Sequence, residues 1–136
     1  MAKDGETVQA NIITYLKSKT VVTSLLSTGA QEIREAEWQG EDFSYPNIRI
    51  GVDFMPAIEG CGPDDADITI DSFSAEKSSK QASHISAALK ALLHKHPFQV
   101  GGMTFSTVVV RRVGRPERTI YGWMSQIDLF VQIAEQ

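Results

Sequence analysis

The chain has 136 residues, 42% of them hydrophobic and 22% charged, which is the size and composition of one globular domain with a single core. Its net charge of −4 argues against a dedicated nucleic-acid binder, although one local basic patch is compatible with that sum. The single cysteine, Cys61, leaves no partner for an internal disulfide, as is common in proteins made in a reducing cytoplasm. With no apolar run near the roughly 20 residues of a membrane span and no secretory apolar region, we expect one domain over residues 1–136 and no membrane association.

Two helices are predicted at the start of the chain. Thr7–Lys17 has apolar residues three and four positions apart, which form one face of a helix. A second short apolar cluster, residues 21–26, predicts a brief helix that ends at Gly29, because glycine adopts a left-handed cap easily. A short strand is the alternative there, since Val21 and Val22 are β-branched.

Three strands are predicted next. Glu32–Trp38 alternates loosely, and Asn47–Met55 alternates clearly, so the second strand is expected to have one buried face and one solvent-exposed face. Pro46 fixes an extended entry into that strand. Pro56–Ala66 is rich in Gly, Pro and Asp and predicts a loop, after which Asp67–Phe73 predicts another strand.

The longest helical pattern runs from Ser74 to Pro97. Its apolar residues recur at helical spacing and predict a face that packs against the strands on both sides: Ala82, Ile85, Ala88, Leu89, Leu92 and Leu93. Ser74 is the expected N-cap, and Pro97 is expected to end the helix.

The last part of the chain predicts a hairpin. Gly101-Gly102 forms a turn before the strand Met103–Arg112, the polar turn Val113–Arg118 follows, and a long final strand is expected over Thr119–Ala134. The predicted order is therefore α-(α)-β-β-β-α-β-β. Because strands come in adjacent runs, this order indicates an α+β fold with a mainly antiparallel sheet and helices packed on one face.

Motifs of catalysis and of metal binding are weak. His94 and His96 lie two positions apart and would point in different directions on a helix, so we interpret them as solvated residues at its end. Cys61 has acidic neighbours, which disfavour a nucleophilic thiolate. Asp64, Asp65 and Asp67 lack the spacing of a calcium loop, and the alternative is a solvated loop or a strand cap. We expect no catalytic residue, no metal and no cofactor.

One basic cluster stands out from the acidic background: Arg111, Arg112, Arg115 and Arg118. Its position at the tip of the last hairpin suggests contacts with an acidic partner surface or with a nucleic-acid backbone. The alternative is a solubilising tip whose charges pair with Glu117 and nearby acids. In a ring-shaped oligomer, one modest patch per subunit would become a basic belt.

The ordered set of elements resembles the bacteriophage tail terminator, or tail completion, proteins. The resemblance rests on an initial helix, on Tyr45-Pro46-Asn47-Ile48 opening an alternating strand, on DITIDSF (residues 67–73) leading into SSKQASHISAALKALL, and on IYGWMSQIDLFVQI in the final strand. It covers almost the whole chain, although each motif is short. The arginine cluster and the acidic loop Gly60–Asp67 have no counterpart in the family pattern.

This resemblance implies a structural role without catalysis. It implies a virion protein of the tail or neck, made in the host cytoplasm, that caps the tail tube as a hexameric ring. Such a ring ends tube polymerisation and forms the tail-side surface that joins the head connector, with the tail tube protein and the head–tail connector as partners. DNA would pass through its lumen without sequence-specific binding. The alternative is a monomeric or dimeric neck adaptor module of a phage or related injection machine.

The final strand supports an oligomer on physical grounds. Phe130 projects from the face opposite the apolar row that ends at Ile133, and an exposed apolar sheet face needs a partner. A closed ring would supply one through a repeated head-to-tail interface. The alternative is that the N-terminal helix covers this second face within one subunit.

Overall fold

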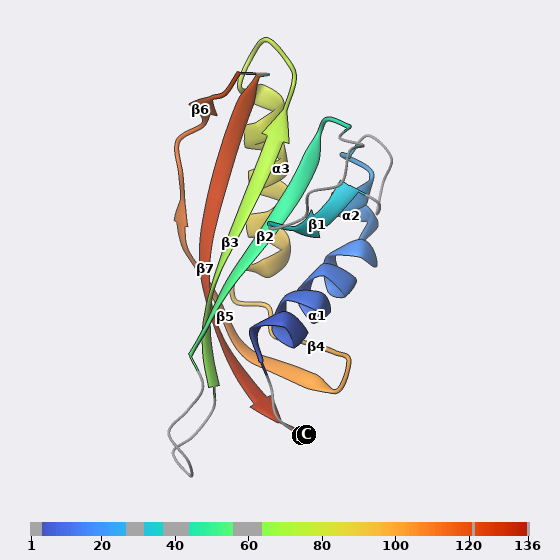
Figure 1. The fold of residues 1–136 in the computed structure, drawn as a ribbon, viewed down its shortest axis with the longest axis vertical. Coiled ribbons are helices and arrows are strands. Elements are labelled where there is room, and N and C mark those ends of the chain that lie inside the picture. Colours follow the sequence, from blue (N-terminus) through green and yellow to red (C-terminus); the bar gives the residue numbers. More distant parts are fainter. Residues whose placement is uncertain (1–3, 27–31, 37–43, 56–63, 121, 136) are drawn as a thin grey trace.

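The computed structural model describes residues 4–26, 32–36, 44–55, 64–120 and 122–135. The elements follow the chain in this order (Figure 1): α1 Gly5–Lys17, α2 Thr20–Thr23, β1 Ile33–Glu35, β2 Asn47–Met55, β3 Asp64–Ser74, α3 Lys80–Leu93, β4 Phe98–Val100, β5 Met103–Val113, β6 Glu117–Arg118 and β7 Trp123–Glu135.

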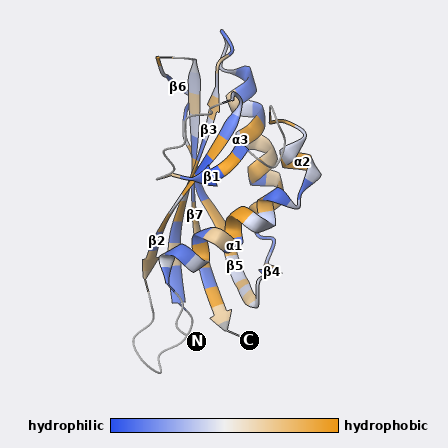
Figure 2. Cartoon of the chain, turned by 45° about the vertical axis from the view of Figure 1, so that its right-hand side comes forward, coloured by the Kyte–Doolittle hydropathy of each residue, from blue (hydrophilic) through white to orange (hydrophobic). Residues whose placement is uncertain are grey.

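The strands form one sheet in the order β1-β2-β3-β7-β5-β4, and β6 pairs with β7. Only the pairing of β1 with β2 is parallel, and the other pairs are antiparallel. Seen from the side, the helices lie on one face of the sheet (Figure 2). This arrangement confirms the predicted α+β class, the mainly antiparallel sheet and the helices on one face.

A single hydrophobic core lies between the helices and the sheet. The helix periodicity and the strand alternation of the sequence account for it, because α1 and α3 each bury one stripe, and β3 and β7 bury every second residue. The helical contribution is Val8, Ile12, Leu16, Ile85, Leu89 and Leu93. The sheet contribution from β2, β3 and β7 is Ile48, Ile50, Ala66, Ile68, Ile70, Ile127, Leu129, Val131 and Ile133.

An aromatic stack ties α1 to the β4–β5 edge of the sheet. The ring centroids of Tyr15 and Phe98 are 3.8 Å apart, and those of Phe98 and Phe105 are 4.6 Å apart. The Gly101-Gly102 turn joins β4 to β5, and both glycines have positive φ values of 59° and 80°. That conformation suits glycine and confirms the predicted turn.

The central helix begins later than expected. Ser74 ends β3, where it pairs with Trp123 of β7, so it cannot serve as the helix cap. Its hydroxyl donates to Oε1 of Gln81 at 2.6 Å and accepts from the backbone N–H of Glu76 at 3.1 Å. The helix itself begins at Lys80. Strand pairing therefore overrides the local capping signal.

The strand boundaries also differ from expectation. β1 has only the residues Ile33–Glu35, and the last two positions of the predicted strand lie outside the described residues. β3 begins at Asp64, three residues inside the predicted loop, whose other positions, 56–63, are outside the described residues. The expected solvent-exposed face of β2 is wrong at its start, because Asn47 and Arg49 are only 3% and 8% exposed.

The two N-terminal helices form as predicted, whereas the final strand begins later than predicted. α1 confirms the first helix, and α2 confirms the predicted brief helix, rather than the alternative strand, for the second cluster. The predicted end of that helix, Gly29, lies outside the described residues. The final strand begins at Trp123, not at Thr119, because the N–H of Thr119 donates to the carbonyl of Gly122 at 2.8 Å and closes a turn. The short strand β6 was not predicted.

Candidate functional site

The four predicted arginines lie together on one projecting part of the last hairpin, which we call the arginine arm and define as residues 111–120. The arm leaves the end of β5, passes through β6 and ends in the turn before β7, along the margin of the sheet in Figure 1. Its backbone is held to β7, because the N–H of Gly114 donates to the carbonyl of Gln126 at 2.7 Å. The indole N–H of Trp123 also donates to the carbonyl of Lys77 at 3.1 Å. These bonds fix the base of the arm.

A register shift brings the first arginine over the sheet. The pairing of β5 with β7 is irregular between Val110 and Arg112, which is the position of Arg111 and has the form of a β-bulge. The Arg111 guanidinium lies 4.4 Å from the centroid of the Phe130 ring and 3.7 Å from the Asp67 carboxylate. Arg111 therefore covers part of the Phe130 ring that the sequence had suggested was bare.

The other three arginines are exposed, and within the described part of the chain none of them forms an ion pair: Arg112, Arg115 and Arg118. The alternative that the cluster is neutralised within the subunit holds only for Arg111, whose partner is Asp67 and not Glu117. Near the tip, the side chain of Ile120 is 93% exposed. Within the described residues, the arm therefore presents three arginines without an ion pair and one exposed carboxylate, Glu117, next to the exposed side chain of Ile120.

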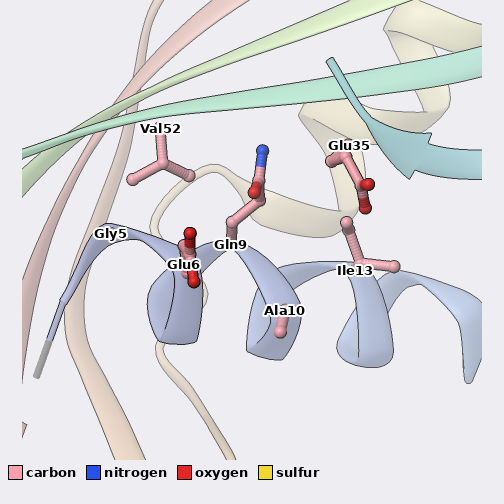
Figure 3. Close-up of a pocket in the computed structure, with 7 residues that line it drawn as sticks. All are labelled: Gly5, Glu6, Gln9, Ala10, Ile13, Glu35 and Val52. Atoms are coloured by element: carbon pink, nitrogen blue, oxygen red, sulfur yellow. The ribbon is translucent and has the colours of Figure 1, made fainter. Parts of the chain in front are cut away.

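A groove lies at the opposite edge of the sheet, between α1 and the strands β1 and β2. It has a volume of about 600 Å³, and we call it the acidic groove (Figure 3). It is lined by Gly5, Glu6, Gln9, Ala10, Ile13, Glu35 and Val52. Two of these side chains are carboxylates and none is basic, while Ala10, Ile13 and Val52 supply apolar surface. The groove therefore combines negative charge with an apolar lining.

The same groove follows an open strand edge. The register of β1 with β2 ends at Ile50, whose carbonyl accepts from the N–H of Ala36 at 2.9 Å and from Nε2 of Gln9 at 2.7 Å. β2 continues to Met55 with β3 as its only strand neighbour among the described elements. Such an edge offers unpaired backbone groups to an added extended segment.

The second face of the sheet is not covered by α1, so the alternative that the N-terminal helix covers it is wrong for the described residues. α1 packs on the core side with α3 (Figure 2). The side chains on this second face are half-buried and are polar, aromatic or, at Met124, aliphatic: Thr69, Asp71, Phe73, Met124, Gln126, Asp128 and Phe130. On this face, Gln126 donates to the Asp71 carboxylate at 3.1 Å.

Replacing Asp71 with asparagine is expected to raise the free energy of unfolding at neutral pH and to leave it nearly unchanged at acidic pH. Burial raises the pKa of the Asp71 carboxyl, the nearby Asp128 carboxylate also raises it, and the Gln126 hydrogen bond opposes both. Because this pKa exceeds the unfolded value of about 3.9, the folded state binds more protons. Stability therefore falls as the pH rises from about 4 through the folded-state pKa. Asparagine keeps an oxygen for Gln126 and has no charge to bury.

Urea unfolding of the wild type and of Asp71→Asn at acidic and neutral pH measures this difference. The exposed Asp53 on the same strand pair provides the matched control, Asp53→Asn, which should show no such pH-dependent gain. An Asp71→Asn gain of the same size at both pH values would contradict the assignment to a buried charge.

The histidines and aspartates that the sequence offered as weak candidates lie at the end of α3 and in β3. His94 lies at the end of α3, as predicted. Its Nδ1 accepts from the backbone N–H of Val110 at 3.0 Å, so the interpretation of His94 as a solvated residue is wrong. This bond occupies a backbone N–H of β5. His96 is exposed. Asp64, Asp65 and Asp67 belong to β3, and Cys61 lies outside the described residues.

Two further findings concern metal and membrane binding. Across the described ranges, no group of three His, Cys, Asp or Glu side chains is arranged to hold a metal ion. None of the described helices has the length and apolar character needed to cross a bilayer.

Sequence reasoning found the arginines and missed the groove. The cluster is visible because its members are neighbours in the chain. Glu6, Glu35 and Val52 come from three separate elements, so no local pattern joins them. Ile120 could have been noticed as an isolated apolar residue beside a polar turn, but it was assigned to the final strand.

Comparison with known proteins identifies the fold. No protein-family model matches the chain, and no curated protein matches it. Among solved structures, a chain of the "Virion of native gene transfer agent (GTA) particle" matches with a TM-score of 0.69 and 19% identity over 95% of both chains. A second solved structure matches with a TM-score of 0.54 and 15% identity, over 95% of this chain and 92% of its own. The chain therefore shares its whole fold with a component of a gene transfer agent virion.

Proposed function

We propose that this chain is a structural protein of a phage-like virion. Its role would be to cap the tail tube as a hexameric ring, to end tube polymerisation and to form the tail-side surface that joins the head connector. The observation that carries the virion assignment is the fold shared with the gene transfer agent virion chain over 95% of both chains. The resemblance of the element order and short motifs to tail terminator proteins supports the more specific role.

The surfaces of the subunit support an assembly protein. Among the described residues, one sheet face is not covered by a helix, β2 has an open edge, and the projecting arm carries three arginines without an ion pair. An open strand edge is a liability in an isolated subunit and is satisfied when a partner covers it, while the exposed arginines offer charge to an acidic partner. The expected partners are further copies of the chain, the tail tube protein and the head–tail connector. DNA would cross the lumen without sequence readout, as the net charge of −4 favours.

Light scattering on the purified protein, with negative-stain images of any large species, tests this proposal. We expect rings of six copies of the 15.0 kDa chain. Added to growing tail tubes, the protein should bind their ends and stop elongation. A protein that never joins tube ends, alone or in complex, would contradict the terminator role, and a monomer with one neck partner would favour the adaptor.

A further inference from the structure

Two surfaces of this subunit are complementary, and they lie at opposite edges of the sheet. The arginine arm runs from the end of β5 through β6, on the far side of β7 from β3, whereas β1 and β2 lie at the other side of the sheet (Figure 1). The acidic groove lies beside β1 and β2. The order β2-β3-β7-β5 places three strand intervals between them, or roughly 14 Å at the usual strand spacing. Because the base of the arm is bonded to β7, the arm cannot fold back into the groove of its own subunit.

The complementarity has three parts. The arm presents unpaired guanidinium groups on Arg115 and Arg118, and the groove presents the carboxylates of Glu6 and Glu35. The exposed side chain of Ile120 matches the apolar lining of the groove. Among the described strands, β6 pairs with β7 alone, and the groove follows the part of β2 that has only β3 as a neighbour.

The carboxylates of the groove are available for this contact. Glu6 and Glu35 are exposed, and Glu35 also interacts electrostatically with Arg49 of β2. Figure 3 shows that Glu6 comes from the first turn of α1 and Glu35 from the facing strand β1. A guanidinium group at either carboxylate would gain charge-assisted hydrogen bonds to a side chain on a rigid element.

We infer that the arginine arm of one copy docks into the acidic groove of the next copy. This interface joins different surfaces of the two copies, so its repetition produces a closed ring when the rotation allows closure. The inference rests on the proposed ring and identifies the contact that would build it. It also implies that opposite charges steer the association, which salt should weaken.

Charge reversal on each surface tests the inference. Arg115→Glu with Arg118→Glu reverses the arm, and Glu6→Lys with Glu35→Lys reverses the groove. Each double variant should lower the association constant by at least about tenfold, because each juxtaposes like charges. The control Lys17→Glu with Lys90→Glu makes the same change of charge as the arm variant, at exposed helix positions outside both surfaces, and should assemble normally. Circular dichroism and thermal unfolding verify that every variant is folded.

Mixing the two reversed variants gives the decisive result. In a one-to-one mixture, the acidic arm of one variant fits the basic groove of the other, and the remaining arm and groove are unchanged. The mixture should therefore assemble as an alternating ring, although neither variant assembles alone. A variant that carries all four reversals should also assemble by itself.

The outcomes separate this interface from the proposed function. If wild-type rings form and both reversed variants still form them, the interface is wrong and the ring stands. If the arm variant assembles but fails to bind tubes or DNA, the arm contacts those partners and the inference is overturned. If the wild type stays monomeric at its highest soluble concentration yet caps tube ends, the interface is again overturned and the terminator role survives.

Discussion

Replacing Phe105 with alanine is expected to lower the free energy of unfolding by about 3–5 kcal/mol. Phe105 has no exposed surface, and its ring stacks on Phe98, which in turn stacks on Tyr15 of α1. The substitution removes buried area, leaves a cavity and breaks the stack that holds the β4–β5 edge to α1. Because a domain of this size is stable by only about 5–15 kcal/mol, this one change would remove a large part of its stability.

Denaturant unfolding followed by circular dichroism measures this loss. Val109→Ala is the control, because Val109 lies on the same strand with its side chain half-buried and should cost about 1 kcal/mol or less. If the two variants lose equal stability, the aromatic stack does not contribute as we infer. Purified Phe105→Ala that remains folded should still assemble, because Phe105 belongs to neither the arm nor the groove.

Replacing Gly122 with alanine is expected to destabilise the fold by about 1–3 kcal/mol, as overpacking does. A Cβ at this position would overlap the backbone carbonyl oxygen of Ser74 and lie 2.8 Å from Cα of Ala75. Both of these atoms belong to the backbone at the end of β3, so no side-chain rotation can relieve the contact. The start of β7 must move away from β3, and the base of the arginine arm moves with it.

Thermal unfolding and the assembly assay together test the Gly122 prediction. Gly51→Ala is the matched control, because a Cβ there meets Cβ of Ala36 at an ordinary 3.7 Å. Alanine at that site in β2 should leave stability unchanged or raise it by about 0.4–1 kcal/mol. The expected result for Gly122→Ala is a lower melting temperature and weaker association. A stable Gly122→Ala with normal assembly would show that the β3–β7 junction tolerates displacement.

The candidate surfaces were predictable to very different degrees. The arginine cluster could be found in the sequence because its residues are close together in the chain. Which of these arginines form an ion pair could not be predicted. A β-bulge directs Arg111 onto Phe130 and Asp67 and leaves the other three arginines unpaired. The acidic groove could not be found at all, because Glu6 and Glu35 come to line one groove only when α1 packs beside β1.

The sequence by itself determined the class of fold, because periodicity is a local property. Helical spacing specified α1 and α3, alternation specified β2 and β7, and Gly101-Gly102 specified a turn. Tertiary structure decided where the elements end: pairing with β7 extends β3 from Asp64 to Ser74 and delays the helix to Lys80. The physical reason is that strand ends and surface complementarity depend on hydrogen bonds and packing between segments far apart in the chain. A local sequence pattern does not reveal these contacts.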